Sequence, residues 1–288
     1  MRFTLAESMC DPSHYVPLAL AAEGAGYTSF AIPDSLAYPE TSDSKYPYTP
    51  DGNREFLDGR PFVDPFVLAA TLGAVTERLR LTTFVVKLAV RQPVLVAKQA
   101  MSVAVMTGNR FGFGVGLSPW PEDFEICGEP WKGRGKRMDE MIEILRGLET
   151  GEFFGYDGND YQLQRIKMAP APTRRIPILI GGHSPAALRR AARTGDGWMH
   201  AGGDADELGV LIDQIQSLRK DYGREAEPFE IHVISMDGFT VDGCKRLEDR
   251  GVTDVIVGFR NAYQPDTMNI DQKLAAVEGF ANGVIAKL

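Results

Sequence analysis

The feature that most constrains the fold is an alternation of short apolar strands with helical segments, repeated about eight times along the chain. Strands are predicted at about 2–6, 28–32, 79–86, 111–115, 177–180, 198–199, 230–234 and 254–257. Strands that alternate with helices form a parallel sheet, and 288 residues suit one closed barrel better than two doubly wound halves. We therefore predict an α/β fold, a TIM-like (β/α)8 barrel, as a single domain over residues 1–288.

Two segments are predicted as insertions, after the second and fourth strands. Residues 37–62 are polar and rich in Pro and Gly, and their aromatic residues include Tyr38, Tyr46, Tyr48 and Phe56. Loops this long usually form lids or binding walls, with disorder as the alternative. The second insertion, 151–176, contains a pattern typical of a β-hairpin with its turn at Asp157-Gly158.

Composition excludes several classes of partner. The net charge of −8 and the absence of a long basic run argue against binding to nucleic acid or to an anionic membrane surface. No apolar run approaches the length of a membrane span, and no signal peptide is visible, so we expect a cytoplasmic protein. Cys10, Cys127 and Cys244 lie far apart without metal-ligand spacing, which supports neither a disulfide framework nor a zinc site.

A glycine pair marks a candidate phosphate site. Apolar residues 177–180 run into Gly181 and Gly182, and Ser184 followed by proline then begins a helix. This places the N–H groups of Gly182, His183 and Ser184 at the positive end of a helix dipole, where a phosphate would fit. A tight strand-to-helix turn explains the same residues equally well, and the motif alone leaves both interpretations open.

Side chains at the carboxyl ends of barrel strands are the candidates for chemistry. Asp34 and Ser35 follow the second strand, and His200 ends the sixth. The carboxylate could orient a ligand or exchange a proton, although an aspartate after proline is also a common turn former. No HExxH, GxSxG or P-loop motif accompanies them, so the sequence shows no hydrolase machinery.

The stretch around the fourth strand offers a second candidate wall. Gly112, Gly114 and Gly116 alternate along it, so a flat ring could lie against the backbone, or the barrel could pack tightly there. The spacing is not that of a Rossmann nucleotide site. Trp120, with Glu122 close by, follows this strand and could line a pocket or cover the rim of the barrel.

Taken together, six stretches resemble the bacterial luciferase-like family of flavin monooxygenases and deazaflavin-dependent oxidoreductases. They occur in the family's order, at residues 22–34, 75–81, 92–99, 108–116, 134–140 and 181–198. The resemblance implies a TIM-like barrel with insertions, a homodimer or larger assembly, and a tricyclic redox cofactor at the mouth formed by the carboxyl ends of the strands.

The resemblance also implies roles for individual residues. It implies cofactor contacts for Asp34, Thr83, Phe84, Val85, Gly114, Gly116, Leu117, Ser118, Gly181, Gly182, His183 and Ser184. Phe84-Val85 corresponds to a non-proline cis peptide that the family often has behind the central ring of its cofactor. The loop from Gly181 to Ser184 corresponds to the one nearest the cofactor phosphate, which favours phosphate binding there over a bare turn.

The activity that the resemblance implies is hydride transfer between coenzyme F420 and a small organic substrate. The alternatives are an FMN-dependent monooxygenase and a noncatalytic flavin-binding protein. Ser35 stands where several family members have a histidine, which leaves Asp34, Glu122 and His200 as candidate catalytic residues. The expected substrate-binding residues are Ser35, Tyr38, Phe56 and Trp120, and no metal is expected.

Overall fold

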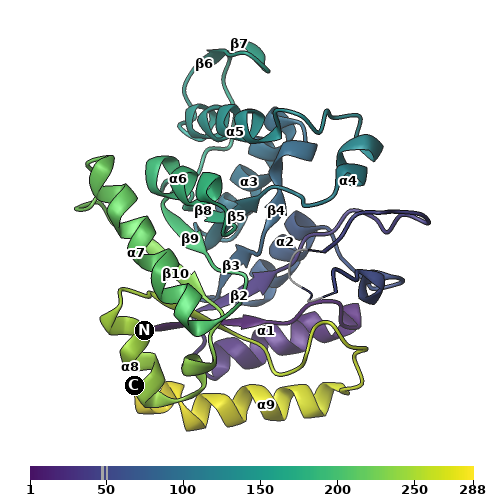
Figure 1. The fold of residues 1–288 in the computed structure, drawn as a ribbon, viewed down its shortest axis with the longest axis vertical. Helices are drawn as coiled ribbons and strands as arrows, with labels where there is room; N and C mark the ends of the chain where they lie inside the picture. The colour runs from purple at the N-terminus through teal and green to yellow at the C-terminus, as the bar shows by residue number, and fades with distance from the viewer. Residues whose placement is uncertain (47–48, 50) are drawn as a thin grey trace.

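The computed structural model describes residues 1–46, 49 and 51–288, and within them eight parallel strand positions close into a barrel (Figure 1). Around the barrel the strands are β1 (Arg2–Ala6), β2 (Ser29–Ile32), β3 (Arg80–Thr83) continued by β4 (Val86–Lys87), β5 (Phe111–Gly116), β8 (Ile178–Gly181), β9 (Gly197–Met199), β10 (Glu230–Val233) and β11 (Asp254–Val257). Pairing of β11 with β1 and of β3 with β5 closes the ring. The predicted barrel is confirmed.

A helix follows each strand position and covers the outside of the barrel (Figure 1). These helices are α1 (Tyr15–Gly24), α2 (Pro65–Val75), α3 (Pro93–Met106), α5 (Arg134–Leu148), α6 (Pro185–Thr194), α7 (Ala205–Asp221), α8 (Val241–Asp249) and α9 (Ile270–Gly283). Asp64, Gln92 and Ser184 cap the starts of α2, α3 and α6 with their side chains, and a proline follows each cap. Local sequence therefore sets where these helices begin.

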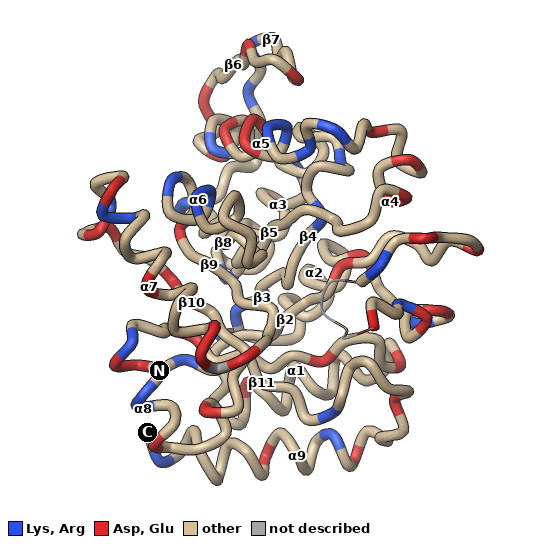
Figure 2. The backbone as a smooth tube through the Cα atoms, in the orientation of Figure 1, with Lys and Arg blue, Asp and Glu red and all other residues tan. Residues whose placement is uncertain are grey.

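The core lies on both sides of the strands. β2, β5 and β11 are buried along their whole length because one face meets the helices and the other fills the barrel. Short 3-10 helices occupy some connections: η1 (Pro12–His14), η2 (Glu55–Leu57), η3 (Leu88–Val90), η4 (Met236–Phe239) and η5 (Ile285–Lys287). Basic residues at the start of α5 are followed by acidic ones (Figure 2). No described helix has the length and apolarity to cross a bilayer.

The strand predicted over 79–86 is in fact divided into β3 and β4. The peptide bond between Phe84 and Val85 is cis, as the resemblance implied, and the two residues bulge out of the ladder between the two pieces. A short helix, α4 (Pro121–Ile126), lies in the connection that follows β5. Its six residues are too few to show a helical period.

The predicted hairpin is present as β6 (Phe154–Asp157) and β7 (Gln162–Ile166), which stand out beyond α5 (Figure 1). The turn expected at Asp157-Gly158 is wrong, because Asp157 pairs with Gln162 and residues 158–161 make the connection. The Glu140 carboxylate of α5 accepts backbone hydrogen bonds from residues 159–161 and fixes this wider turn. The sequence did not indicate the wider turn, because Glu140, which fixes it, lies outside the hairpin in α5.

Candidate active site at the barrel mouth

A cavity of about 1070 Å³ lies at the carboxyl ends of the barrel strands. Its lining includes the last residue of β1 and β5, Ala6 and Gly116, together with Gly181 at the end of β8 and Gly258 just after β11. A pocket for one small ligand is commonly about 300–1,000 Å³. The cavity therefore has room for a large cofactor together with a small substrate.

The bulge at Phe84 and Val85 forms part of the cavity lining. Two glycines make room for the Val85 side chain. A Cβ atom on Gly116 would lie 2.8 Å from Cγ2 of Val85, and one on Gly181 would lie 3.0 Å from Cγ1. The two glycines and the bulge are thus one packed unit, which explains why both strands end in residues without side chains.

Gly114 and Thr83 do not line the cavity, which corrects the cofactor contacts expected for them. A Cβ atom on Gly114 would lie 1.9 Å from the carbonyl oxygen of Thr83 and 2.6 Å from Sδ of Met199. Thr83 is itself buried and donates a hydrogen bond of 2.7 Å from Oγ1 to the carbonyl of Gly114. Of the two interpretations of the glycine pattern, tight packing holds at this position.

Asp34 lines the cavity, but its carboxylate is held by neighbouring donors. Nη2 of Arg91 lies 2.8 Å from Oδ1 and 2.9 Å from Oδ2, and the backbone N–H of Lys87 donates to Oδ2 over 2.9 Å. The side chain is only 1% exposed. This arrangement makes Asp34 an organiser of the mouth and corrects the expectation of an acid that exchanges protons with a ligand.

Glu122 lies outside the cavity, which corrects its expected catalytic role. Its carboxylate accepts hydrogen bonds from the hydroxyl groups of Ser42 and Ser44 and lies 3.6 Å from Nη1 of Arg54. These three partners belong to the 37–62 segment, so Glu122 ties that segment to α4. Tyr38 lies beside the same contacts and away from the cavity, so the substrate contact expected for it is also corrected.

His183 lines the cavity, whereas His200 lies behind it and is 1% exposed. The two rings stack with centroids 4.6 Å apart and planes 10° from parallel. Nε2 of His183 accepts a hydrogen bond of 3.0 Å from the N–H of Ala201. Burial, and secondarily the neighbouring His183, lowers the pKa of His200 to about 4. The structure therefore makes His200 a neutral support for His183, which corrects its expected catalytic role.

The glycine loop is arranged much as its sequence indicates. Gly181 and Gly182 line the cavity, and Gly182 has a φ of +117°, a conformation that side chains rarely allow. Ser184 does not line it. Its Oγ accepts a hydrogen bond of 3.2 Å from the N–H of Ala187 and caps α6. The capping role predicted for Ser184 is thus confirmed, and a cofactor contact through its backbone N–H stays a prediction.

Leu117 and Trp120 line the cavity, and Ser118 does not. Ser118 is 2% exposed, and its hydroxyl donates to Asp123 and accepts from the N–H of Trp120. Ser118 therefore orients this loop, in place of the cofactor contact expected for it. Asp123 also holds Lys87, whose Nζ lies 2.6 Å from Oδ2 of Asp123 and 4.4 Å from the centre of the Trp120 ring.

Four cavity-lining aromatic side chains form what we call the aromatic wall: Tyr46, Phe56, Trp120 and Tyr263. Ring centroids are 5.0 Å apart for Phe56 and Tyr263, 5.3 Å for Tyr46 and Phe56, and 5.9 Å for Tyr46 and Trp120. Phe56 and Trp120 were expected in the substrate site, as was Ser35, which also lines the cavity. Tyr48, another aromatic residue of the 37–62 segment, lies outside the described residues.

Sequence reasoning missed the contribution of the loops after β1 and β11. Glu7, Arg260 and Tyr263 line the cavity from these loops. Nε of Arg260 lies 2.7 Å from Oε1 of Glu7, and Nζ of Lys273 lies 3.1 Å from the same oxygen. The position of Glu7 just after the first strand was the available signal, because that end of a barrel strand faces the mouth.

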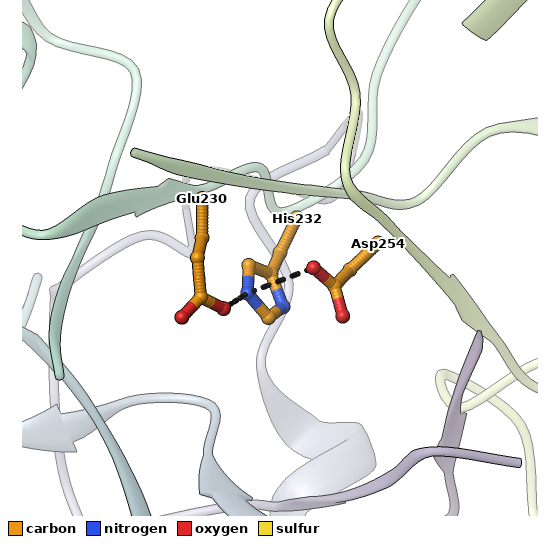
Figure 3. A group of neighbouring side chains, drawn as sticks. All are labelled: Glu230, His232 and Asp254. Carbon is orange, nitrogen blue, oxygen red and sulfur yellow. Dashed lines mark hydrogen bonds and ion pairs between the residues drawn. The ribbon is translucent and has the colours of Figure 1, made fainter. Parts of the chain in front are cut away.

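A second charged cluster lies at the opposite end of the barrel (Figure 3), where β10 and β11 begin. Glu230, His232 and Asp254 bring one ligand-type atom each within 4.8 Å of one another. Both carboxylates are already bound by arginine: Arg80 lies 2.6 Å from Glu230, and Arg2 lies 3.0 Å from Glu230 and 2.6 Å from Asp254. The cluster is an ion-pair layer that closes the bottom of the barrel.

Comparisons with known proteins agree with this architecture. An uncharacterized protein of Mycobacterium tuberculosis (strain H37Rv) is 63% identical over 290 residues, covering 100% of both chains. The F420-dependent glucose-6-phosphate dehydrogenase of Tsukamurella paurometabola is 29% identical over 204 residues, which are 68% of this chain and 55% of that protein. The solved coenzyme F420-dependent tetrahydromethanopterin reductase of Methanopyrus kandleri has a TM-score of 0.76 at 15% identity, covering 99% of each chain.

A family description also matches most of the chain. The model of the luciferase-like monooxygenase family matches residues 4–236, which include the first seven barrel strands and the mouth loops that follow them. The family also contains F420-dependent oxidoreductases among the relatives of this chain. On this evidence the chain belongs to the luciferase-like monooxygenase family.

Proposed function

We propose that this protein is an oxidoreductase that transfers a hydride between coenzyme F420 and a small organic substrate. The observation that carries the proposal is the 1070 Å³ cavity at the carboxyl ends of the strands, which has a glycine-lined end at Gly181 and Gly182 and an aromatic wall elsewhere. Relatives described as F420-dependent support the choice of cofactor. The family's description as monooxygenases keeps an FMN-dependent monooxygenase as the alternative.

The residues of the mouth suit a cofactor with a flat ring and an anionic tail. Gly182 lines the cavity just before the start of the ten-residue helix α6, and its φ of +117° and the 3.2 Å that an added Cβ atom would leave to Cβ of Ala187 both favour glycine there. The helix dipole favours negative charge at that point, so Gly182 and His183 would hold a phosphate. Phe84 and Val85 would support the ring, and when bound the deazaflavin supplies the site that accepts or donates the hydride.

The rest of the chain would orient the two reactants and exclude water. The aromatic wall and the Val85 bulge present apolar surface to the cavity, while Asp34 with Arg91 and Lys87 with Asp123 fix the loops that carry them. Nothing in this arrangement requires a protein nucleophile. The work assigned to the protein is positioning, which matches a reaction in which the cofactor carries the chemistry.

Cofactor choice is tested by thermal denaturation with F420 and FMN added separately. A ligand that binds only the folded state stabilises it by RT ln(1 + [L]/Kd), so F420 should raise Tm and FMN should not. His183→Ala should reduce the shift, and Tyr222→Ala, at an exposed position after α7, should leave it unchanged. FMN binding with oxygen-dependent consumption of NADH would establish the alternative, and failure of both cofactors to bind would reject the proposal.

A further inference from the structure

We infer that the substrate is an uncharged molecule with an aromatic or other apolar group, held against the aromatic wall. The inference rests on the proposed function and adds the substrate class to it. It is carried by the arrangement of the cavity's two ends, by the ring contacts in the wall, and by the pairing of the charges that line the cavity.

The strand order places the two ends of the cavity on different sides of the barrel. The glycine end stands over β8 and β9, where Gly181, Gly182, Gly202 and Gly203 line the cavity. In the closed ring, β2 lies three positions from β8 and four from β9, and β11 lies three positions from β8 and two from β9. Tyr46, Phe56 and Tyr263 come from the loops after β2 and β11, and Trp120 comes from the loop after β5. If the anionic tail of the cofactor binds at the glycine end, the aromatic wall remains available for the substrate.

The rings of the wall already pack edge to face and leave apolar surface toward the cavity. Phe56 and Tyr263 meet at 85° between ring planes, and Tyr46 meets Phe56 at 62°. Such edge-to-face contacts are preferred by aromatic rings, and a further ring or a compact hydrocarbon can join them. Leu57 and Phe62 also line the cavity and extend the same apolar side.

Four of the charged side chains that line the described part of the cavity are paired with an opposite charge: Glu7, Asp34, Lys87 and Arg260. Lys87 is bound by Asp123 at 2.6 Å, and Arg260 is bound by Glu7 at 2.7 Å. Asp34 is bound by Arg91 at 2.8 Å. Glu207 adds a further negative charge at the start of α7.

A phosphate or carboxylate on the substrate would therefore need a cation that an acidic side chain already holds. An anion that displaced the acidic partner would leave that carboxylate partly buried without a compensating charge, which disfavours the exchange. Glu207 would in addition repel an anion. The site thus disfavours the sugar phosphates named for one relative of this chain and favours neutral compounds.

The first test compares neutral and anionic compounds of similar shape on the wild-type enzyme loaded with F420. 1-Phenylethanol and cyclohexanol represent the expected class, and mandelate and glucose 6-phosphate represent the excluded one. Reduction of F420, and ligand-observed NMR binding that needs no turnover, should both detect the neutral compounds at concentrations where the anions give no signal. Preference for either anion, with F420 bound, overturns the inference and leaves the proposed function intact. Absence of F420 binding rejects the proposed function instead.

The second test removes one ring of the wall. Tyr263 is 37% exposed on the loop after β11, so Tyr263→Ala should fold normally. An aromatic contact of about 0.5–1.5 kcal/mol corresponds to a loss of roughly 2- to 12-fold in affinity for 1-phenylethanol. Tyr263→Phe keeps the ring and should bind more tightly than Tyr263→Ala, and Tyr222→Ala, at a 40% exposed position away from the cavity, is the matched control. Unchanged affinity in Tyr263→Ala, or equal losses in both Tyr263 variants, contradicts the aromatic contact.

Discussion

The carboxylate of Asp34 and the guanidinium of Arg91 form an ion pair, with Nη2 2.8 Å from Oδ1 and 2.9 Å from Oδ2. The pair joins the end of β2 to the residue that follows η3. Because Arg91 is 15% exposed and Asp34 is 1% exposed, neither charge has much access to water. The acid expected from sequence to act on a ligand instead holds two loops of the mouth together.

Asp34→Asn should destabilise the protein by roughly 3 kcal/mol, because it leaves the Arg91 charge without its partner. The double variant Asp34→Asn with Arg91→Gln should recover part of that loss, since it removes the stranded charge as well. Urea denaturation of the wild type, both single variants and the double variant measures the coupling. Additive effects of the two substitutions would show that the pair contributes nothing.

Gly114→Ala should destabilise the barrel by about 1–3 kcal/mol or more, the usual cost of overpacking. The added Cβ atom would stand 1.9 Å from the backbone oxygen of Thr83, which has no flexible end to move away. Gly279→Ala is the control, because it lies within α9 with nothing within 4 Å of its Cβ and should stabilise by roughly 0.5–1 kcal/mol. Differential scanning calorimetry on both variants compares the two, and a neutral Gly114→Ala would refute the packing role.

His200 should make the protein less stable as the pH falls from about 6.5 to about 4. Burial lowers the pKa of His200 to about 4 in the folded state, so over this range the unfolded chain binds a proton that the folded chain does not. The contribution of His200 to the stability of the fold is fully present above about pH 6.5 and is lost as the pH falls toward about 4. His200→Phe removes the titration and keeps a ring beside His183, so its stability should fall less over the same range. If the stability of the wild type and of His200→Phe changed equally with pH between about 6.5 and about 4, the titration would not belong to His200.

Divalent metal ions should not bind at Glu230, His232 and Asp254. Burial alone would raise the pKa of Glu230, but hydrogen bonds from His232 and Arg80 outweigh it and hold that pKa well below its usual range. The Glu230 carboxylate is thus ionised, and arginine side chains already bind both carboxylates. Zinc or manganese should leave Tm unchanged, whereas Glu230→Gln should lower it, because Arg2 and Arg80 lose their shared partner. A metal-dependent rise in Tm that Glu230→Gln abolishes would show the opposite.

The homodimer implied by the family resemblance should form through the outer faces of α2 and α3. These helices pack side by side and expose apolar side chains, with Val67 59% and Leu95 64% exposed. Val67→Arg with Leu95→Arg should convert the dimer to single chains, as measured by light scattering after size-exclusion chromatography. Val210→Arg, at a 55% exposed apolar position on α7, is the matched control. A mass that stays dimeric in the double variant would locate the interface elsewhere.

The sequence by itself determined the order of strands and helices, because each depends on local period, caps and turn residues. Ser184 with its following proline predicted the start of α6, and the position of Asp34 and Ser35 after the second strand predicted that both would lie at the mouth. The family resemblance added the cis peptide at Phe84-Val85. These features involve neighbouring residues or fixed positions in the barrel, so they can be recognised without knowledge of the tertiary contacts.

Only the tertiary structure decided which polar side chains remain available for a ligand. Asp34, Glu122 and His200 are the residues that the sequence offered as catalytic candidates. In the structure Arg91 binds Asp34, Ser42 and Ser44 bind Glu122, and His200 is buried behind His183, so each has a supporting role. The aromatic wall likewise needed Tyr263, more than 200 residues after Phe56. Pairing of charges and meeting of rings depend on distances between segments far apart in the chain, and closure of the barrel sets those distances.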